Sequence, residues 1–172
     1  MNKLYTFFYL LCLFLIVACT PEEKEESKNL PPLTNDIING DKLWSRINSE
    51  DNFKDWSSWP DYEGIRPGQS PHGRFHKIYI NDVLAKALPI TKNIAPMGSI
   101  IIKENYDSNK KVLEYTVMAK IEGYNPSQGD WFWGYYQPDG GVKMEGKPAM
   151  CIDCHASSSS DFVLLQRLDF GE

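Results

Sequence analysis

The chain contains 172 residues, with 18 Lys and Arg against 23 Asp and Glu, and its formal net charge is −5. This length suits one domain and excludes a multidomain enzyme. The excess of acidic residues leaves no basic surface for phosphate backbones, so we expect no nucleic-acid partner. Hydrophobic residues make up 42% of the chain, enough for a folded core, and four cysteines are too few for a disulfide-rich scaffold.

Residues 1–18 have the pattern of a secretory signal peptide. Lys3 is followed by an uncharged apolar run, as is typical of such signals. The run ends in Leu15-Ile16-Val17-Ala18-Cys19, which resembles the lipobox of bacterial lipoproteins and implies cleavage before a diacylated Cys19. The alternative is an uncleaved membrane anchor, but about 15 apolar residues fall short of the roughly 20 that span a bilayer. We therefore expect an exported lipoprotein on the periplasmic side of the cell envelope, with Thr20 favouring the outer membrane.

Residues 19–38 are expected to form a flexible linker between the lipid and a folded domain. The stretch from Thr20 to about Asp36 is rich in glutamate and proline. Such a composition is too charged and too rich in proline to bury a core. The folded domain then covers residues 39–172, and we expect it to meet the membrane only through the lipid anchor.

The folded domain is predicted to begin with a short helix. Asp41 is a candidate N-cap, and Leu43, Trp44 and Ile47 have helical spacing, with Trp44 turned inward. A loop rich in glycine and proline follows over residues 62–73, with Arg66-Pro67-Gly68 as a turn.

Strand patterns dominate the rest of the domain. Alternation and β-branched residues predict four strands, over Arg74–Ile80, Ser99–Asn105, Val112–Ile121 and Asp130–Gln137. A brief helix capped by Asn81-Asp82 separates the first two strands and ends at Pro89. We therefore predict a mainly β (α+β) fold, an antiparallel sheet with a few short helices.

The two remaining cysteines lie in Cys151-Ile152-Asp153-Cys154-His155 near the carboxyl end. This is the pattern for covalent haem c attachment. One turn of chain places two thiols against the two vinyl groups of a haem, and the adjacent imidazole reaches the iron. Cys151 and Cys154 are therefore candidates for the thioethers and His155 for the proximal iron ligand. The alternatives are a redox dithiol and half of a zinc site, for which His72 and His76 remain as conventional ligands.

The late position of this motif constrains the kind of haem protein. Small helical electron carriers place the motif early, and later helices wrap the haem, whereas little chain follows His155 here. The pocket must therefore come from upstream, where strand patterns prevail. We expect an antiparallel sheet to cover one face of a single, covalently attached haem c.

Four segments in combination resemble the cytochrome P460 family and the related β-sheet cytochromes c′. They are His72-Gly73-Arg74-Phe75-His76, Gly98-Ser99-Ile100-Ile101-Ile102-Lys103-Glu104, Gly129-Asp130-Trp131 and the haem attachment motif. The resemblance covers most of the chain from about Trp44 onward. It implies a mainly antiparallel β fold, usually homodimeric, with a five-coordinate haem c. Members oxidise hydroxylamine or bind nitric oxide, so the resemblance allows either a haem-dependent oxidoreductase or a binding protein.

The resemblance also gives Lys103 a candidate role. In catalytic members a lysine nitrogen is bonded to the haem macrocycle, and the matching segment here contains Lys103. Strand alternation places Ser99, Ile101 and Lys103 on one face of a largely apolar strand. Burial there would lower the pKa of Lys103 and provide the neutral amine that bond formation needs. The alternative is an ordinary surface lysine at the end of a strand.

The segment that matches the family's distal strand supplies the remaining candidates. Some members place phenylalanines there that exclude water, and Phe75 fits that role. His72 and His76 depart from an aromatic wall, and either is a candidate proton acceptor near the iron; the alternative is that they are loop and core histidines. A third function is electron transfer, with His76 or a methionine as sixth ligand. The expected partners are a small nitrogen compound and an electron-acceptor protein.

Overall fold

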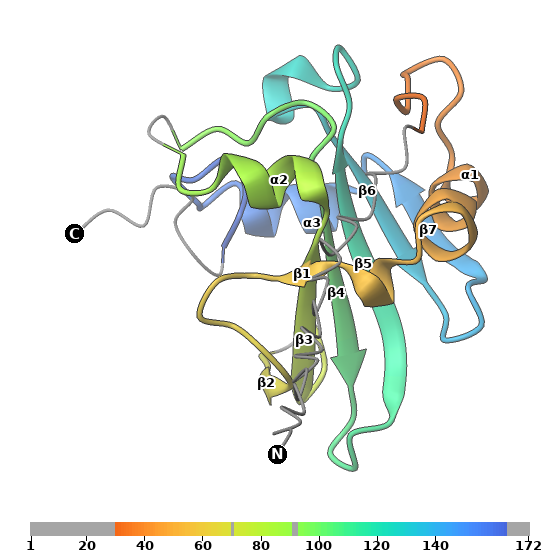
Figure 1. Ribbon diagram of the computed structural model, residues 1–172, viewed down its shortest axis with the longest axis vertical. Coiled ribbons are helices and arrows are strands. Elements are labelled where there is room, and N and C mark those ends of the chain that lie inside the picture. The colour runs from red at the N-terminus through yellow and green to blue at the C-terminus, as the bar shows by residue number, and fades with distance from the viewer. Residues whose placement is uncertain (1–29, 70, 91–92, 165–172) are drawn as a thin grey trace, which may run out of the picture.

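The computed structural model describes residues 30–69, 71–90 and 93–164. The expected signal peptide, Cys19 and most of the linker lie outside these residues. Seven strands form one antiparallel sheet in the order β1-β3-β4-β5-β6-β7, with β2 beside β3 (Figure 1). The strands are β1 (Ser57–Ser58), β2 (Arg66–Pro67), β3 (Phe75–Ile80), β4 (Ile100–Tyr106), β5 (Val112–Lys120), β6 (Trp131–Tyr136) and β7 (Val142–Gly146).

Helices are short and lie around the sheet. The α-helices are α1 (Gly40–Ser45), α2 (Asp82–Ala87) and α3 (Ala149–His155). Other helical turns cover Arg46–Glu50, Phe53–Asp55 and Pro126–Gln128. Among the described residues, no helix has the length and apolar character needed to cross a membrane. The fold is mainly β with a few short helices, as predicted.

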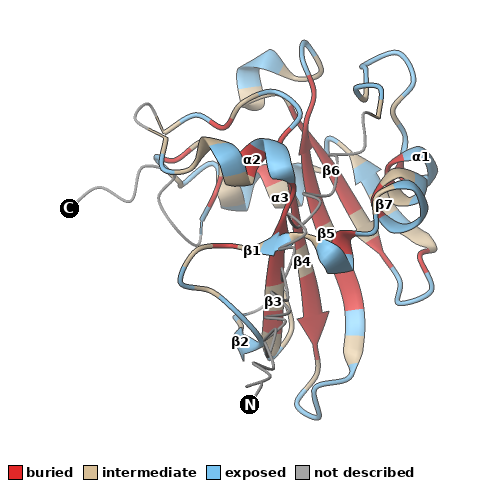
Figure 2. Cartoon of the chain, in the orientation of Figure 1, coloured by how far each residue is buried: buried red, intermediate tan, exposed pale blue. Residues whose placement is uncertain are grey.

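The sheet separates two hydrophobic clusters, and its strands are largely buried (Figure 2). On one face, Leu43 of α1 packs with Ile102 and Tyr136 in a core rich in aromatic rings. On the other face, Leu84 of α2 and Ile152 of α3 belong to a second cluster. In Figure 1, α1 lies beside β6 and β7, whereas α2 and α3 lie together on the other side. The second face therefore carries the helix with the attachment motif.

Alternation along β4 determines which side chains reach each face. Ile100 and Ile102 belong to the first cluster and Ile101 to the second, as the sequence predicted. Lys103 shares the face of Ile101, and it is paired in register with Ile78 on β3 and Thr116 on β5. The lysine therefore lies in the middle strand of three, away from any sheet edge.

Three local expectations need correction. The N-cap of α1 is Asn39, whose side chain accepts a hydrogen bond from the Lys42 backbone N–H at 2.9 Å, whereas Asp41 lies in the first turn. Residues 66–67 form β2, which pairs with β3, instead of a turn. Strand β7 was not predicted, because a five-residue edge strand after a turn has too few alternating residues to give a clear period.

Candidate functional site

A cavity of about 610 Å³ opens between the second face of the sheet and α3. This volume falls within the range of cofactor and small-molecule sites. Strands β3, β4, β5 and β6, helix α3 and the loop before β3 all contribute to its wall. Among the lining residues are six of the candidates from the sequence: His72, His76, Lys103, Cys151, Cys154 and His155. Tertiary structure thus brings together residues that are up to 83 positions apart in the chain, from 72 to 155.

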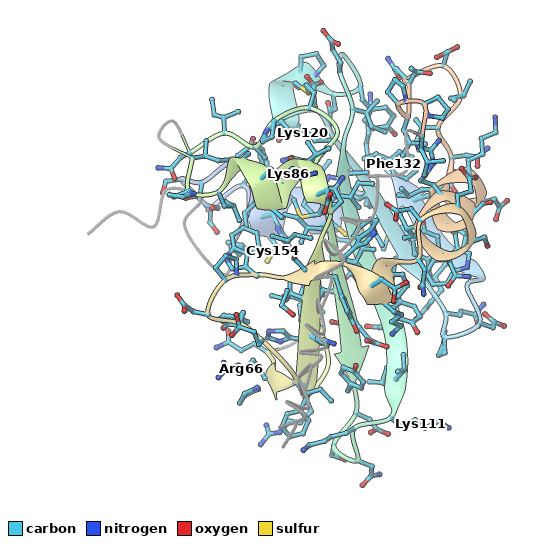
Figure 3. All side chains as sticks on the ribbon, viewed as in Figure 1. Arg66, Lys86, Lys111, Lys120, Phe132 and Cys154 are labelled. Atoms are coloured by element: carbon cyan, nitrogen blue, oxygen red, sulfur yellow. The ribbon has the colours of Figure 1, made fainter. Side chains whose placement is uncertain are left out.

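Helix α3 presents the attachment motif to this cavity. Cys151 and Cys154 are separated by one helical turn, so their thiols lie on the same face of the helix. Neither thiol forms a disulfide; Cys151 is half-buried, and Cys154, which Figure 3 labels, is exposed. Ile152 belongs to the second cluster, against which Cys151 also packs, and so anchors the helix to the sheet. Burial raises the pKa of the Cys151 thiol.

His155 closes α3 with one ring nitrogen already engaged. Its Nδ1 lies 2.7 Å from the backbone carbonyl oxygen of Phe162, to which Nδ1–H donates. The tautomer with a proton on Nδ1 leaves the Nε2 lone pair available to a metal. The ring packs against Trp133, with centroids 4.8 Å apart and planes at 75°. Burial lowers the pKa of His155 and so favours the neutral imidazole, whereas the hydrogen bond to Phe162 acts in the opposite direction.

Lys103 enters the cavity from β4 without a counter-ion. Among the described residues no carboxylate pairs with its ammonium and no acceptor binds it; the recorded ion pairs involve other lysines. Burial lowers the pKa of Lys103 to about 8. Because each pKa unit is a tenfold change in the protonation equilibrium, about a tenth of the amine is neutral at pH 7, far more than for a solvated lysine. The pKa values of three histidines, His72, His76 and His155, are all lowered in part by this charge.

The two remaining histidines occupy different environments. Nδ1 of His72 lies 3.4 Å from Thr116 Oγ1, which also accepts from the Asn105 amide at 3.3 Å. The rings of His72 and His155 are perpendicular, with centroids 6.1 Å apart. Burial, followed by the charge of Lys103, lowers the pKa of His72 to about 3. His72 is therefore a neutral imidazole held close to the proximal candidate.

His76 is more enclosed, with 2% of its surface exposed. It stacks on Tyr62, with ring centroids 5.8 Å apart and planes 9° from parallel. Within the described part of the chain, both of its ring nitrogens lack a hydrogen-bond partner. Burial, followed by the charge of Lys103, lowers the pKa of His76 to about 4. The His76 side chain belongs to the wall of the cavity.

Phe75 does not line this cavity. It alternates with His76 and so shares the side of Tyr79, which belongs to the first cluster. The Lys110 ammonium lies 5.8 Å from the centre of the Phe75 ring. The role expected of Phe75 as a distal wall therefore finds no support in its position. The lipidation candidate Cys19 lies outside the described residues.

Several lining residues were missed by sequence reasoning. Trp59 and Tyr62 come from the loop between β1 and β2, and Thr116, Met118 and Trp133 come from β5 and β6. Met118 had no assigned role, whereas Trp133 was expected to pack the sheet and to position the haem edge. Alternation on β5 groups Thr116 with Met118, but only the register with β4 places that group next to Lys103.

A search of curated proteins found no match. The family model described as Cytochrome P460 matches residues 50–164. The matched range includes strands β1 to β7 and helix α3, and hence every residue of the cavity named above. The chain belongs to the cytochrome P460 family, and this membership implies a haem cofactor.

Proposed function

We propose that this chain is an exported haem c protein that binds or oxidises small nitrogen compounds, such as hydroxylamine or nitric oxide, at an open iron position. The observation that carries the proposal is the convergence of the Cys151 and Cys154 thiols, the His155 imidazole and the Lys103 amine on one cavity. Family membership supplies the haem. When bound, the haem provides an iron that coordinates the substrate nitrogen and a ring system that accepts electrons.

The residues of the cavity fit such a group. Trp59 Nε1, Trp133 Nε1 and both nitrogens of His76 are buried, and in the described residues they find no hydrogen-bond partner. Buried polar atoms without partners are uncommon in folded proteins, and all three of these side chains belong to the wall of the cavity. Cys151 and Cys154 would hold the haem through thioethers, and His155 would bind the iron through Nε2.

Each remaining side chain then has a specific task. Neutral His72, held by Thr116, would donate a hydrogen bond to a bound ligand or accept one from it. Because its pKa is low, His72 is a weak proton acceptor near neutral pH. Lys103, with a pKa of about 8, is better matched to proton transfer near neutral pH. Lys103 is also the candidate for the lysine cross-link of catalytic family members. That bond replaces one N–H and one C–H hydrogen, so its formation is a two-electron oxidation and needs a peroxide-class oxidant.

Peptide mapping of the haem-bearing protein tests the site. The proposal expects haem joined to the peptide of Cys151 and Cys154, with the Lys103 peptide joined to it through the macrocycle. Separate release of the Lys103 peptide would contradict the cross-link, and haem-free Cys151 and Cys154 peptides would contradict the whole proposal. Steady hydroxylamine turnover with an artificial electron acceptor would then separate an enzyme from a protein that only binds nitric oxide.

A second candidate function, electron transfer, has one observation in its favour. The His72 and His155 rings are 6.1 Å apart across the same cavity, and Met118 also lines it. Either side chain could close the sixth iron position. A spectrum of six-coordinate low-spin iron in both oxidation states would favour this function and exclude small-molecule chemistry.

Export and lipid attachment at Cys19 remain part of the proposal, as do a homodimer and an electron-acceptor partner. Growth with a labelled fatty acid should label the wild-type chain but not Cys19→Ala. Equal labelling of both chains would contradict the proposed anchor.

A further inference from the structure

The segment that follows α3 folds into a tight loop beneath His155. Ser158 Oγ donates to the Val163 carbonyl at 2.7 Å and accepts from the Ser160 N–H at 3.0 Å. The Val163 N–H donates to the Ser160 carbonyl at 2.9 Å. At the tip, Asp161 and Phe162 have φ angles of 51° and 66°. Two successive non-glycine residues in the left-handed region are strained, so contacts from elsewhere must hold them.

Those contacts come from a buried ion pair. Asp161 Oδ2 accepts from Lys120 Nζ at 2.6 Å and from the Ala95 backbone N–H at 2.9 Å. The Asp161 carbonyl accepts from Trp131 Nε1 at 2.9 Å. Lys120 also donates to the Gly129 carbonyl at 2.7 Å. Both charged side chains are almost fully buried, with 2% of Lys120 and 6% of Asp161 exposed. Lys120 is the last residue of β5, and Lys111 precedes the other end of that strand (Figure 3).

Stability alone gives a weak reason to bury this pair, because the cost of desolvating two charges commonly cancels their attraction. The position of the pair suggests a different role. Asp161 immediately precedes Phe162, whose carbonyl accepts the His155 Nδ1 proton. Holding Asp161 at its side chain and its carbonyl therefore holds the next carbonyl in place under the imidazole.

We propose that Lys120 and Asp161 are positioning residues for the proximal imidazole, which keep the Phe162 carbonyl on Nδ1 and so direct Nε2 of His155 to the haem iron. The inference rests on the proposed function, because His155 must hold the iron. A partner on the second nitrogen sets the tautomer and the ring orientation of a ligating histidine and raises its basicity. The ion pair thus acts on His155 indirectly: it holds the Asp161 backbone, which in turn holds the Phe162 carbonyl.

Asp161→Asn in the haem-bearing protein is the first test. Asparagine tolerates positive φ well, so this change removes the charge and retains the backbone preference. We expect the His155 Nδ1 proton, observed by NMR as a shifted exchangeable signal, to exchange with solvent on the order of 100-fold faster, because losing one partner of a buried pair opens the loop. We also expect the iron–histidine stretching frequency of the ferrous protein to fall as the hydrogen bond weakens.

A matched control separates positioning from general destabilisation. Leu43→Ala creates a cavity in the first cluster, on the opposite face of the sheet. It should lower overall stability and leave the exchange rate and the stretching frequency at their wild-type values. A shift of both signals by Leu43→Ala equal to that of Asp161→Asn would overturn the inference.

Two further variants keep the test decisive if Asp161→Asn fails to fold. The double variant Lys120→Met, Asp161→Asn leaves no unpaired buried charge and should fold while retaining the fast exchange. Trp131→Phe removes the indole hydrogen bond to Asp161 but keeps both charged side chains, and it should give a smaller acceleration. Wild-type signals in every folded variant would overturn the inference while His155 still binds iron. Absence of an iron–histidine signal in the wild-type protein would overturn both this inference and the proposed function.

Discussion

Lys103 and Glu104 are neighbours on β4, yet their side chains face opposite environments. Glu104 has 3% of its surface exposed in the aromatic core, where its carboxylate accepts from Lys54 and from the Tyr79 hydroxyl at 3.0 Å. Lys103 faces the cavity and has no such partner among the described residues. The charge of Glu104 is therefore satisfied in the aromatic core, whereas the charge of Lys103 has no partner in the described part of the cavity.

This difference extends to the uncharged groups. Trp59, His76 and Trp133 line the cavity, and each carries a buried polar atom that the described chain leaves without a partner. Tyr136 in the aromatic core, by contrast, donates to the Gly40 carbonyl at 3.1 Å. Packing faces satisfy their own polar groups, because leaving them unpaired costs free energy. Of the five side chains with unpaired buried polar atoms in the described residues, three line this cavity, whereas Ser99 and Asn105 do not.

The largest effect is expected from removing the two thiols that line the cavity. Cys151→Ala with Cys154→Ala should abolish covalent haem attachment, because no thioether can form, while the sheet and the aromatic core remain. Haem staining after denaturing electrophoresis and intact mass measure this loss. Met150→Ala is the matched control, since Met150 also lines the cavity and is 64% exposed. Haem retained by the double variant would remove the distinction between the two faces.

Glu104→Gln should destabilise the aromatic core and leave the cavity unchanged. We expect unfolding free energy to fall by about 3 kcal/mol, because a buried carboxylate with charged and hydroxyl donors is lost. Burial alone would raise the pKa of Glu104, but hydrogen bonds from Lys54, Tyr106 and Tyr79 outweigh it and lower the pKa.

The pH dependence of unfolding gives this prediction a sign. A carboxyl whose pKa is lower in the folded state stabilises the protein above its unfolded pKa, about 4.3, and loses that contribution as the pH falls through the folded pKa. Urea unfolding at several pH values should therefore show a steeper acid decline for the wild type than for Glu104→Gln. Unchanged haem attachment is the internal control. A parallel decline in both proteins would contradict the proposed role of Glu104.

Lys103→Met sharpens the comparison from the other side. In the haem-free Cys151→Ala, Cys154→Ala background, the change should raise unfolding free energy at pH 7 by about 2 kcal/mol, because a buried ammonium is replaced by an apolar chain. Burial lowers the pKa of Lys103 to about 8, whereas the pKa of an unfolded lysine is about 10.4. In the parent protein that retains Lys103, unfolding free energy should therefore increase as the pH rises between these two pKa values. Urea unfolding should show that this slope disappears with Lys103→Met. An unchanged slope would identify Lys103 as solvated.

Thr116→Val should produce the smallest effect. The substitution removes the hydroxyl that holds His72 Nδ1 and keeps the branched shape on β5. We expect about 1 kcal/mol, or roughly a fivefold change, in the affinity of the haem-bearing protein for nitric oxide. Ligand titration followed by absorbance measures it. Thr34→Val, at an exposed hydroxyl remote from the cavity, should leave the affinity unchanged, and an equal change in both variants would exclude a role for the His72 contact.

Much of the fold could be predicted because its signals are local. Strand periods located β3, β4, β5 and β6, and the caps located α2. Short elements escaped, since β2 and β7 acquire their structure by pairing with longer strands and carry little periodicity of their own. Phe75 was assigned to the distal wall from its segment alone, although alternation with His76 turns it to the opposite face.

The sequence by itself determined the spacing of the two cysteines and the histidine on α3 and the alternation that separates Lys103 from Glu104, because both depend on residues a few positions apart. Only the tertiary structure decided which side chains meet those groups. The register of β4 with β5 brings Thr116 and Met118 beside Lys103, and the loop after α3 brings the Phe162 carbonyl to His155. Such contacts depend on strand pairing and on a buried ion pair between distant residues, Lys120 and Asp161, which no local pattern encodes.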